Sequence, residues 1–291
     1  MKNRFFELQF RKDLSLIGFE ILTIKDLYTY NDNLFLASKK RLDFYEVIFL
    51  KEGEGNHFID FDTCDIKKGD ILFIGKNQVH SWQKQRTCDG YILLFTERFL
   101  YENQIQFNDL AYEYPFNSII YNPITSIPDS EIFDTFLALI ELINNEYSLV
   151  KNNIRQELLQ TLLGTFIVKV QSQLSREERR SDKESKEQFI QLQKAIDQNI
   201  EHTRSATDYV NMLGTTYHQL NSTVKRITNK SLKVFIDGSL ILNAKRSLCD
   251  KANNISEIAF MLGFDEPTNF TKFFKKHSQQ TPKQFRESIL Q

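Results

Sequence analysis

The sequence predicts a two-domain α+β protein. We expect a small antiparallel β-barrel and an αα-hairpin in the N-terminal part, and an all-α C-terminal domain with two helix-turn-helix units joined by a linker helix. Three observations predict this: short β-rich segments with glycine turns, a change to helical spacing after residue 129, and a Met-Leu-Gly tripeptide at 212–214 that recurs at 261–263. The expected domains are residues 1–174 and 189–291, with a charged linker at 175–188.

Residues 41–95 have the pattern of a series of short strands. Runs rich in aromatic and β-branched residues stop at glycine-containing turns such as Lys51-Glu-Gly-Glu-Gly55 and Lys67-Lys-Gly-Asp70. The expected strands are residues 41–50, 57–61, 64–66, 71–74, 79–82 and 90–95. Short strands at near-even spacing favour a small antiparallel barrel over an α/β sheet.

After residue 129 the apolar residues follow a helical period. One helix has its apolar positions between Ile132 and Ile143, with Ser130 as the expected N-cap, and a second has them between Leu158 and Val170. Together they predict an αα-hairpin with wide apolar faces. The sequence leaves two roles open for these faces, packing within the N-terminal domain or forming a dimer interface.

Charge is divided unevenly between the two parts. Residues 189–291 hold 14 Lys and Arg against 9 Asp and Glu, a balance of +5, whereas residues 1–188 have a balance of -6. The segment 175–188, almost entirely charged and polar, lies between them and is the expected linker. A basic module joined to an acidic one is typical of a phosphate-binding domain attached to a domain with another task.

Cysteine usage and hydropathy predict a cytoplasmic protein. Cys64, Cys88 and Cys249 are scattered, which argues against a disulfide framework and a zinc finger. The N-terminus has no apolar run of signal-peptide length, and no stretch approaches the roughly 20 apolar residues that span a bilayer. We therefore expect no membrane partner.

The first Met-Leu-Gly motif lies in a predicted helix-turn-helix. Ser205 is the expected cap of a helix that runs to Leu213, Gly214 permits the turn, and a second helix covers about residues 216–228. The second helix of such a unit enters the DNA major groove, so double-stranded DNA is the expected partner. Its core-facing positions are Leu220, Val224 and Ile227.

Polar residues on the outer face of this second helix are the candidate DNA contacts. Asn and Gln side chains can pair bidentately with adenine, and His can donate to guanine. The candidate base-reading residues are His218, Gln219, Asn221 and Ser222. Lys225 and Arg226, one turn later, are expected at phosphates.

The second motif predicts a matching unit. Its first helix covers residues 255–262, and Pro267 suits the first turn of its recognition helix because proline lacks an amide hydrogen that would be unpaired there. Phe270, Phe273 and Phe274 are expected to face inward. The outward residues, which are candidate base readers, are Thr268, Asn269, Thr271 and Lys272. Behind them, the candidate phosphate contacts are Lys275 and Lys276.

A linker helix of about 17 residues is expected between the two units, at residues 232–248. At 1.5 Å per residue it spans roughly 25 Å. A spacer of that length can hold two recognition helices about 34 Å apart, one turn of B-DNA. If the spacing does not match straight DNA, the duplex must bend.

Residues 189–291 resemble the C-terminal domain of AraC-type transcriptional regulators. The matching segments are Ala244-Lys245-Arg246 with Leu248, Ile255-Ser-Glu-Ile-Ala259, Leu262-Gly-Phe264, Asn269-Phe-Thr-Lys-Phe-Phe-Lys-Lys276 and Thr281-Pro282-Lys-Gln-Phe285-Arg286. The resemblance implies seven helices and DNA contacts from both recognition helices. It implies base-reading roles for His218, Asn221, Ser222, Thr268, Thr271 and Lys272.

The chain departs from this family at three positions. Asn229 and Gln279 stand where the family usually has glycine after a recognition helix; Asn tolerates the left-handed conformation, and Gln fits it poorly. Ser239 replaces a commonly basic residue, and the adjacent Gly238 costs about 1 kcal/mol of helix propensity. A softer linker helix is the expected result.

The strands of residues 41–95 resemble the cupin-like sensory barrel found at the front of these regulators. The matching segments are Phe44-Tyr-Glu-Val-Ile-Phe49, Gly53-Glu-Gly55, Asp65-Ile-Lys-Lys-Gly-Asp-Ile-Leu-Phe-Ile74 and Val79-His80. The resemblance implies a small-molecule effector inside the barrel and a homodimer formed through flanking helices. By analogy it also implies RNA polymerase as a partner and activation as the mode of regulation. The effector and its binding residues stay open, with Arg41, Glu46, His57 and His80 as polar residues that could line a pocket.

The sequence thus predicts a DNA-binding transcription regulator that is not an enzyme and has no cofactor. Two alternatives differ in the N-terminal half. A metal-dependent cupin enzyme needs an HxH pair, a nearby acid and a later His, and His57 and His80 form no such pair. Alternatively, the N-terminal half only dimerises. No metal site is expected.

Overall fold

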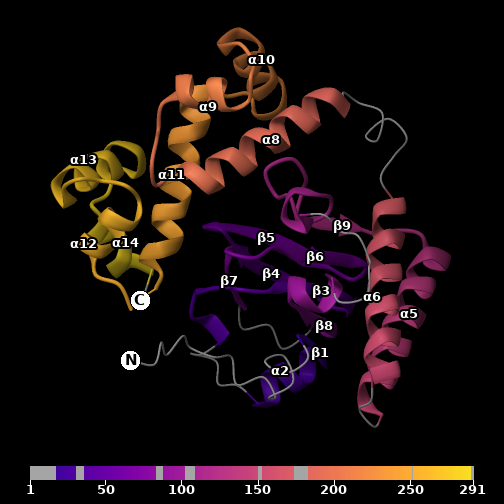
Figure 1. Ribbon diagram of the computed structural model, residues 1–291. Coiled ribbons are helices and arrows are strands. Elements are labelled where there is room, and N and C mark those ends of the chain that lie inside the picture. Colours follow the sequence, from indigo (N-terminus) through magenta and orange to yellow (C-terminus); the bar gives the residue numbers. More distant parts are fainter. Residues whose placement is uncertain are drawn as a thin grey trace. The chain divides into compact units, whose positions relative to one another are not determined.

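The computed structural model describes residues 18–30, 36–82, 88–101, 109–149, 153–173, 183–250 and 252–289. The described residues divide into two compact units, one within Arg4–Ser175 and the other within Arg176–Gln291 (Figure 1). Among the described residues, none of the helices combines the length and the apolar character needed to cross a membrane.

The N-terminal unit contains two antiparallel sheets. The five-stranded sheet has the order β1 (Phe19–Thr23), β8 (Asp89–Phe95), β3 (Tyr45–Glu52), β6 (Asp70–Ile74) and β9 (Ile124–Ser126). The four-stranded sheet has the order β2 (Lys40–Arg41), β7 (Val79–Trp82), β4 (Glu54–Ile59) and β5 (Asp62–Lys67). The antiparallel β-architecture expected from the sequence is confirmed, in the form of two sheets without closure into one barrel. The outer strands β1, β2 and β9 were not expected.

The central strand β3 is buried on both of its faces. It pairs with β8 and with β6, and its residues alternate between two separate cores. Tyr45, Val47 and Phe49 belong to one core, whereas Ile48 and Leu50 belong to the other. Burial on both faces explains why this segment is a continuous apolar run and not an alternating one.

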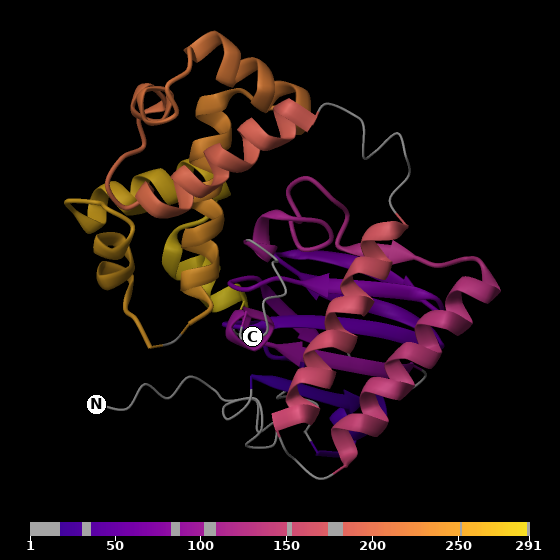
Figure 2. The ribbon, with the colours of Figure 1, turned by 45° about the vertical axis from the view of Figure 1, so that its right-hand side comes forward.

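Helices α5 (Ser130–Ser148) and α6 (Asn153–Ser172) form the expected αα-hairpin. They lie side by side across one face of the five-stranded sheet (Figure 2), and their apolar side chains join its core. Phe136 and Phe166 meet edge to face, with ring centroids 5.5 Å apart. The expectation that Ser130 caps α5 was wrong. Asp129 is the N-cap, and its Oδ1 accepts a 3.0 Å hydrogen bond from the Ile132 N–H.

Packing within the N-terminal unit therefore accounts for the inner face of the hairpin. On its outer face, Leu142, Leu149, Ile154 and Val168 are exposed, Ile154 by 78%. Three short helical segments complete the unit: α2 (Ile24–Tyr30), α4 (Glu97–Tyr101) and a 3-10 turn η1 (Leu110–Tyr112).

The described part of the C-terminal unit contains seven helices, as the family resemblance implied. They are α8 (Lys183–Asn199), α9 (Ala206–Met212), α10 (Tyr217–Thr228), α11 (Leu232–Leu248), α12 (Ile255–Met261), α13 (Pro267–Ser278) and α14 (Pro282–Ile289). Of the segment 175–188 expected as a linker, residues 183–188 begin α8, where Ser185 is buried, and residues 175–182 lie outside the described part of the chain.

Candidate nucleic-acid interface

Helices α9 and α10 form the first helix-turn-helix unit. Ser205 caps α9 by accepting from the Asp208 N–H at 3.4 Å, as expected, and Gly214 makes the turn with φ +59°. Thr216 caps α10 by accepting from the Gln219 N–H at 3.2 Å. The side chains that hold α10 to the core are Leu220 and Val224, fully buried, and Ile227, half-buried.

Three of the four expected base-reading residues of α10 lie on its exposed face. His218, Gln219 and Ser222 are exposed, and the Gln219 side chain accepts from the Thr215 hydroxyl at 3.1 Å. The fourth, Asn221, is half-buried, and its Oδ1 accepts a 2.9 Å hydrogen bond from the Leu232 N–H at the start of α11. Asn221 therefore holds two helices together.

Helices α12 and α13 form the second unit. Asn254 and Glu257 make a reciprocal capping box at the start of α12, and Gly263 makes the turn with φ +72°. Pro267 occupies the first turn of α13, as expected from its missing amide hydrogen. Phe270 and Phe274 are fully buried. Phe273, which we expected to face inward, is only half-buried, with its ring 4.4 Å from that of His277.

The expected base-reading residues of α13 also lie mostly on its exposed face. Thr268, Asn269 and Lys272 are exposed. Thr271 is half-buried, and its hydroxyl donates to the Pro267 carbonyl at 2.9 Å. Because that hydroxyl is engaged by its own helix, the methyl group is the part of Thr271 suited to an apolar contact.

Basic residues end both recognition helices. Lys225 and Arg226 lie in the last turn of α10, Lys275 and Lys276 lie in the last turn of α13, and all four are exposed. They follow the exposed polar residues by about one turn, which suits contacts to the phosphate backbone.

The residues that end the two recognition helices adopt the left-handed conformation. Asn229 has φ +57° and Gln279 has φ +62°, and their N–H groups bond the carbonyls of Lys225 and Lys275. This is the conformation for which the family usually has glycine. Gln279 takes it although a non-glycine side chain costs about 1 kcal/mol there.

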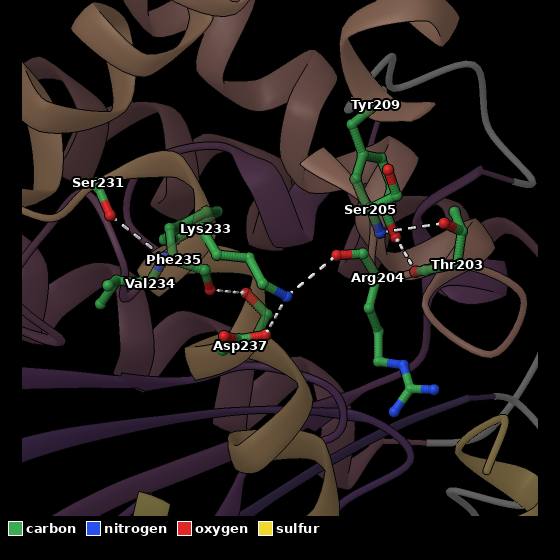
Figure 3. A network of polar contacts seen from close by, with 10 residues as sticks. Thr203, Arg204, Ser205, Tyr209, Ser231, Lys233, Val234, Phe235 and Asp237 are labelled. Carbon is green, nitrogen blue, oxygen red and sulfur yellow. Dashed lines mark hydrogen bonds and ion pairs between the residues drawn. The ribbon is translucent and has the colours of Figure 1, made fainter. Parts of the chain in front are cut away.

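Side chains fix both ends of helix α11, and contacts with two other elements contribute: the loop before α9 at its start and α14 at its end. At its start, the Ser231 hydroxyl accepts from the Val234 N–H at 3.4 Å. The Lys233 ammonium donates to the Asp237 carboxylate at 2.7 Å and to the Arg204 carbonyl at 3.2 Å (Figure 3). At its end, the Arg286 guanidinium donates to backbone carbonyls of Leu248, Asp250 and Asn253.

Sequence reasoning missed the roles of Arg204, Asn221 and Arg286 in holding these helices. Arg286 lies in the segment Thr281–Arg286, which matches the AraC-type family, and this match could have indicated a structural role for it. Arg204 and Asn221 are single polar residues whose partners are distant in the sequence, so no local pattern indicated them.

The N-terminal unit holds a buried polar cluster of Glu46, His57 and His80. His57 Nε2 lies 3.3 Å from His80 Nδ1, and His80 Nε2 lies 3.4 Å from Glu46 Oε2. Strands β3, β4 and β7 bring the three residues together, with His57 also 5.0 Å from Trp82, ring to ring. Arg41, the fourth polar residue we considered, is exposed and donates to the Asn77 side chain.

Burial makes the neutral forms of this cluster the stable ones. Desolvation raises the pKa of Glu46 to about 8, against a smaller opposing effect of Lys40 and of a hydrogen bond from Trp82. Desolvation also lowers the pKa of His57 to about 3 and that of His80 well below its ordinary value. A neutral glutamic acid and two neutral imidazoles suit hydrogen bonding among themselves.

The cluster does not have the geometry of a metal centre. Both ring nitrogens of His80 face other members, so the three side chains form a chain and do not converge on one point. Within the described residues, no group of three or more His, Cys, Asp or Glu side chains is arranged to hold a metal ion.

Comparison with known proteins agrees with the two units. Residues 27–164 match the model of the AraC-like ligand binding domain, and residues 209–288 match a helix-turn-helix domain model. The Msm operon regulatory protein of Streptococcus mutans is 25% identical over 85% of each chain. The transcriptional activator RhaS of Yersinia pestis is 21% identical over 85% of this chain and 88% of its own.

Shorter and more distant similarities accompany these. The probable transcription factor PqrA of Proteus vulgaris is 46% identical over 48 residues, which are 16% of this chain and 39% of PqrA. Among solved structures, ToxT of Vibrio cholerae aligns over 94% of this chain and 98% of its own, with 11% identity and a TM-score of 0.49. The matches to both domain models, in this order along one chain, identify the protein's family. The chain belongs to the AraC-type transcriptional regulators, with a ligand-binding domain followed by a DNA-binding domain of two helix-turn-helix units.

Proposed function

We propose that this regulator binds a bipartite promoter element, with α10 and α13 in successive major grooves. One observation carries the proposal: both recognition helices expose polar side chains on their N-terminal part and paired basic side chains one turn later. Base edges are met by the first group and phosphates by the second. The proposed domain arrangement is 1–174 for sensing and 189–291 for DNA binding, with the 175–188 linker shortened at its C-terminal end because α8 begins at Lys183.

The proposed base-reading residues are those on the exposed faces, and each helix contributes three. They are His218, Gln219, Ser222, Thr268, Asn269 and Lys272. Thr271 is proposed to contact a thymine methyl group through its own methyl group. For Asn221 we propose a positioning role, because bidentate pairing with adenine needs the Oδ1 that accepts from Leu232. The proposed phosphate contacts are Lys225, Arg226, Lys275 and Lys276.

The N-terminal unit is proposed to bind a small-molecule effector. A ligand changes promoter occupancy only if it binds one arrangement of the regulator better than another. Strands β3, β4 and β7 direct the polar cluster of Glu46, His57 and His80 into an interior whose other buried side chains are mostly apolar, which makes this the candidate region for polar ligand contacts. The cytoplasm is the proposed location.

Activation of transcription and a homodimer complete the proposal. RhaS is a transcriptional activator by name, which supports activation and hence RNA polymerase as a partner. The exposed Leu142, Leu149 and Val168 on the outer face of the α5–α6 hairpin support a dimer interface there. Sedimentation of the purified chain tests the dimer, and a monomer at micromolar concentration contradicts it.

DNA selection with the purified full chain tests the proposed function. We expect enrichment of two half-elements about 10 base pairs apart, one turn of the duplex. The best site is then titrated at two salt concentrations, where phosphate contacts make the affinity fall as salt rises. Steep salt dependence without an enriched motif contradicts sequence-specific regulation.

A further inference from the structure

Residues 200–205, the loop between α8 and α9, contact the turn of the second helix-turn-helix unit within the same compact unit. The contact at Gly263 is between backbones: a Cβ added to Gly263 would lie 1.8 Å from the Glu201 carbonyl oxygen and 2.6 Å from its carbon. No side chain fits there. Gly214, at the equivalent turn of the first unit, has no described heavy atom within 4 Å of such a Cβ.

The neighbouring side chains extend this contact to the second recognition helix. The Arg204 guanidinium lies over the Phe264 ring, with Cζ 4.3 Å from the ring centroid. The Phe264 ring in turn packs against Phe270 and Phe273 of α13, at centroid distances of 5.3 and 5.5 Å. Arg204 therefore contacts Phe264, and Phe264 packs directly against α13.

The same loop is also tied to the first unit and to the linker helix. Tyr209 of α9 donates through its hydroxyl to the Thr203 carbonyl at 2.9 Å, and the Thr203 hydroxyl donates to Asp208 at 2.5 Å. From α11, Lys233 donates to the Arg204 carbonyl (Figure 3). One loop thus contacts all three parts: hydrogen bonds join it to the first unit and to the linker helix, and packing joins it to the second unit.

We propose that residues 200–205 set the distance and orientation between the two recognition helices, with Arg204 and Gly263 as positioning residues. The two units are joined along the chain by α11, which contains Gly238, a residue of low helix propensity, near its middle. If α11 were the one connection, bending of this helix would change the distance between the two units. The contacts of residues 200–205 with both units oppose that bending. The consequence for DNA, which rests on the proposed function, is a strict preference for one spacing between half-elements.

A spacing series with the full chain tests this inference. The selected bipartite site is altered by inserting or deleting one base pair, which shifts the second half-element by about 3.4 Å and rotates it by about 35°. We expect wild-type affinity to fall about tenfold or more for either change. For Arg204→Ala the fall should shrink to about threefold or less, while affinity for the original site changes little.

Gly263→Ala and Gly214→Ala form the matched pair. Both replace a glycine with positive φ, so both introduce backbone strain of the same kind, but only Gly263→Ala also meets the Glu201 backbone. Gly263→Ala should shift or broaden the spacing preference, and Gly214→Ala should keep it. Circular dichroism establishes that each variant folds; if Gly263→Ala does not, Arg204→Ala carries the test.

Three outcomes separate the possibilities. An unchanged spacing preference in Arg204→Ala overturns the positioning role and leaves the proposed function intact. If Arg204→Ala weakens binding equally at every spacing and reduces the salt slope by about one, Arg204 is a phosphate contact, and the positioning role is again overturned. A wild-type chain that selects no bipartite motif overturns the proposed function and this inference with it.

Discussion

Asn221 Oδ1 accepts a 2.9 Å hydrogen bond from the N–H of Leu232, the first residue of α11. The first N–H groups of a helix have no partner within the helix, and Ser231 supplies one for Val234. Asn221 supplies another and thereby ties recognition helix α10 to the linker helix. The equivalent pair in the second unit is Thr271 and Pro282, where proline has no N–H to satisfy.

Asn221→Ala is expected to lower the free energy of unfolding by about 1–3 kcal/mol, because the Leu232 N–H loses its acceptor. Asn221→Asp keeps an acceptor at this position and should lose less. Thr271→Ala is the matched control and should change stability by about 0.5 kcal/mol or less. Urea denaturation of the full chain measures all three. If Asn221→Ala is as stable as wild type and changes one position of the selected motif, Asn221 is a base reader.

Asp129→Ala should destabilise the N-terminal unit by about 1 kcal/mol, the usual value of an N-cap. The reason is the loss of the Asp129 acceptor for the Ile132 N–H. Ser130→Ala, one residue later, should be close to neutral. Thermal unfolding of both variants makes the comparison, and a larger loss for Ser130→Ala would restore the cap assignment that the sequence suggested.

Glu46 gives the N-terminal unit a pH dependence of defined sign. Because burial raises the folded-state pKa of Glu46 from 4.5 to about 8, only the unfolded chain releases this proton between those values, and stability falls as pH rises through that window. Glu46→Gln removes the effect. Its stability relative to wild type should therefore increase from pH 5 to pH 8, by at most about 1.4 kcal/mol per pH unit.

His57 acts in the opposite direction. Its folded-state pKa is lowered to about 3, so stability is lost as pH falls from 6.5 towards 3. His57→Gln should therefore flatten the acid side of the stability profile and leave the side above pH 7 unchanged. Denaturation midpoints at pH 4, 5, 6.5 and 8 separate the contribution of Glu46 from that of His57. If the midpoints of wild type, Glu46→Gln and His57→Gln change with pH in parallel, the buried neutral cluster is contradicted.

Lys272→Ala should relax specificity at one base position and cost about 1–3 kcal/mol on the selected site. Lys275→Ala, on the same helix, should weaken binding similarly on every sequence and reduce the salt slope by about one. Titration of the selected site and of single-base variants distinguishes the two lysines. Uniform weakening by Lys272→Ala would make it a phosphate contact.

The helical period and the capping residues determined the C-terminal elements. Helix α11 lies at Leu232–Leu248 as expected, and α10 (Tyr217–Thr228) begins within a residue of its expected start and ends at its expected end. Ser205 and Pro267 sit at the helix starts assigned to them. These features depend on residues three or four positions apart, so a local reading of the sequence is sufficient for them.

The sequence by itself thus determined the two-part architecture, the helix-turn-helix units and the outward polar faces. The tertiary structure decided what each polar side chain meets. Asn221 has the pattern of an outward residue, yet it bonds a helix start 11 residues away. Arg204 lies in a loop and stacks on Phe264, and Glu46 and His80 come from strands that only the sheet arrangement brings together. The physical reason is range: helix periodicity and capping act over one turn, whereas hydrogen bonds and ring contacts between elements depend on how the chain packs.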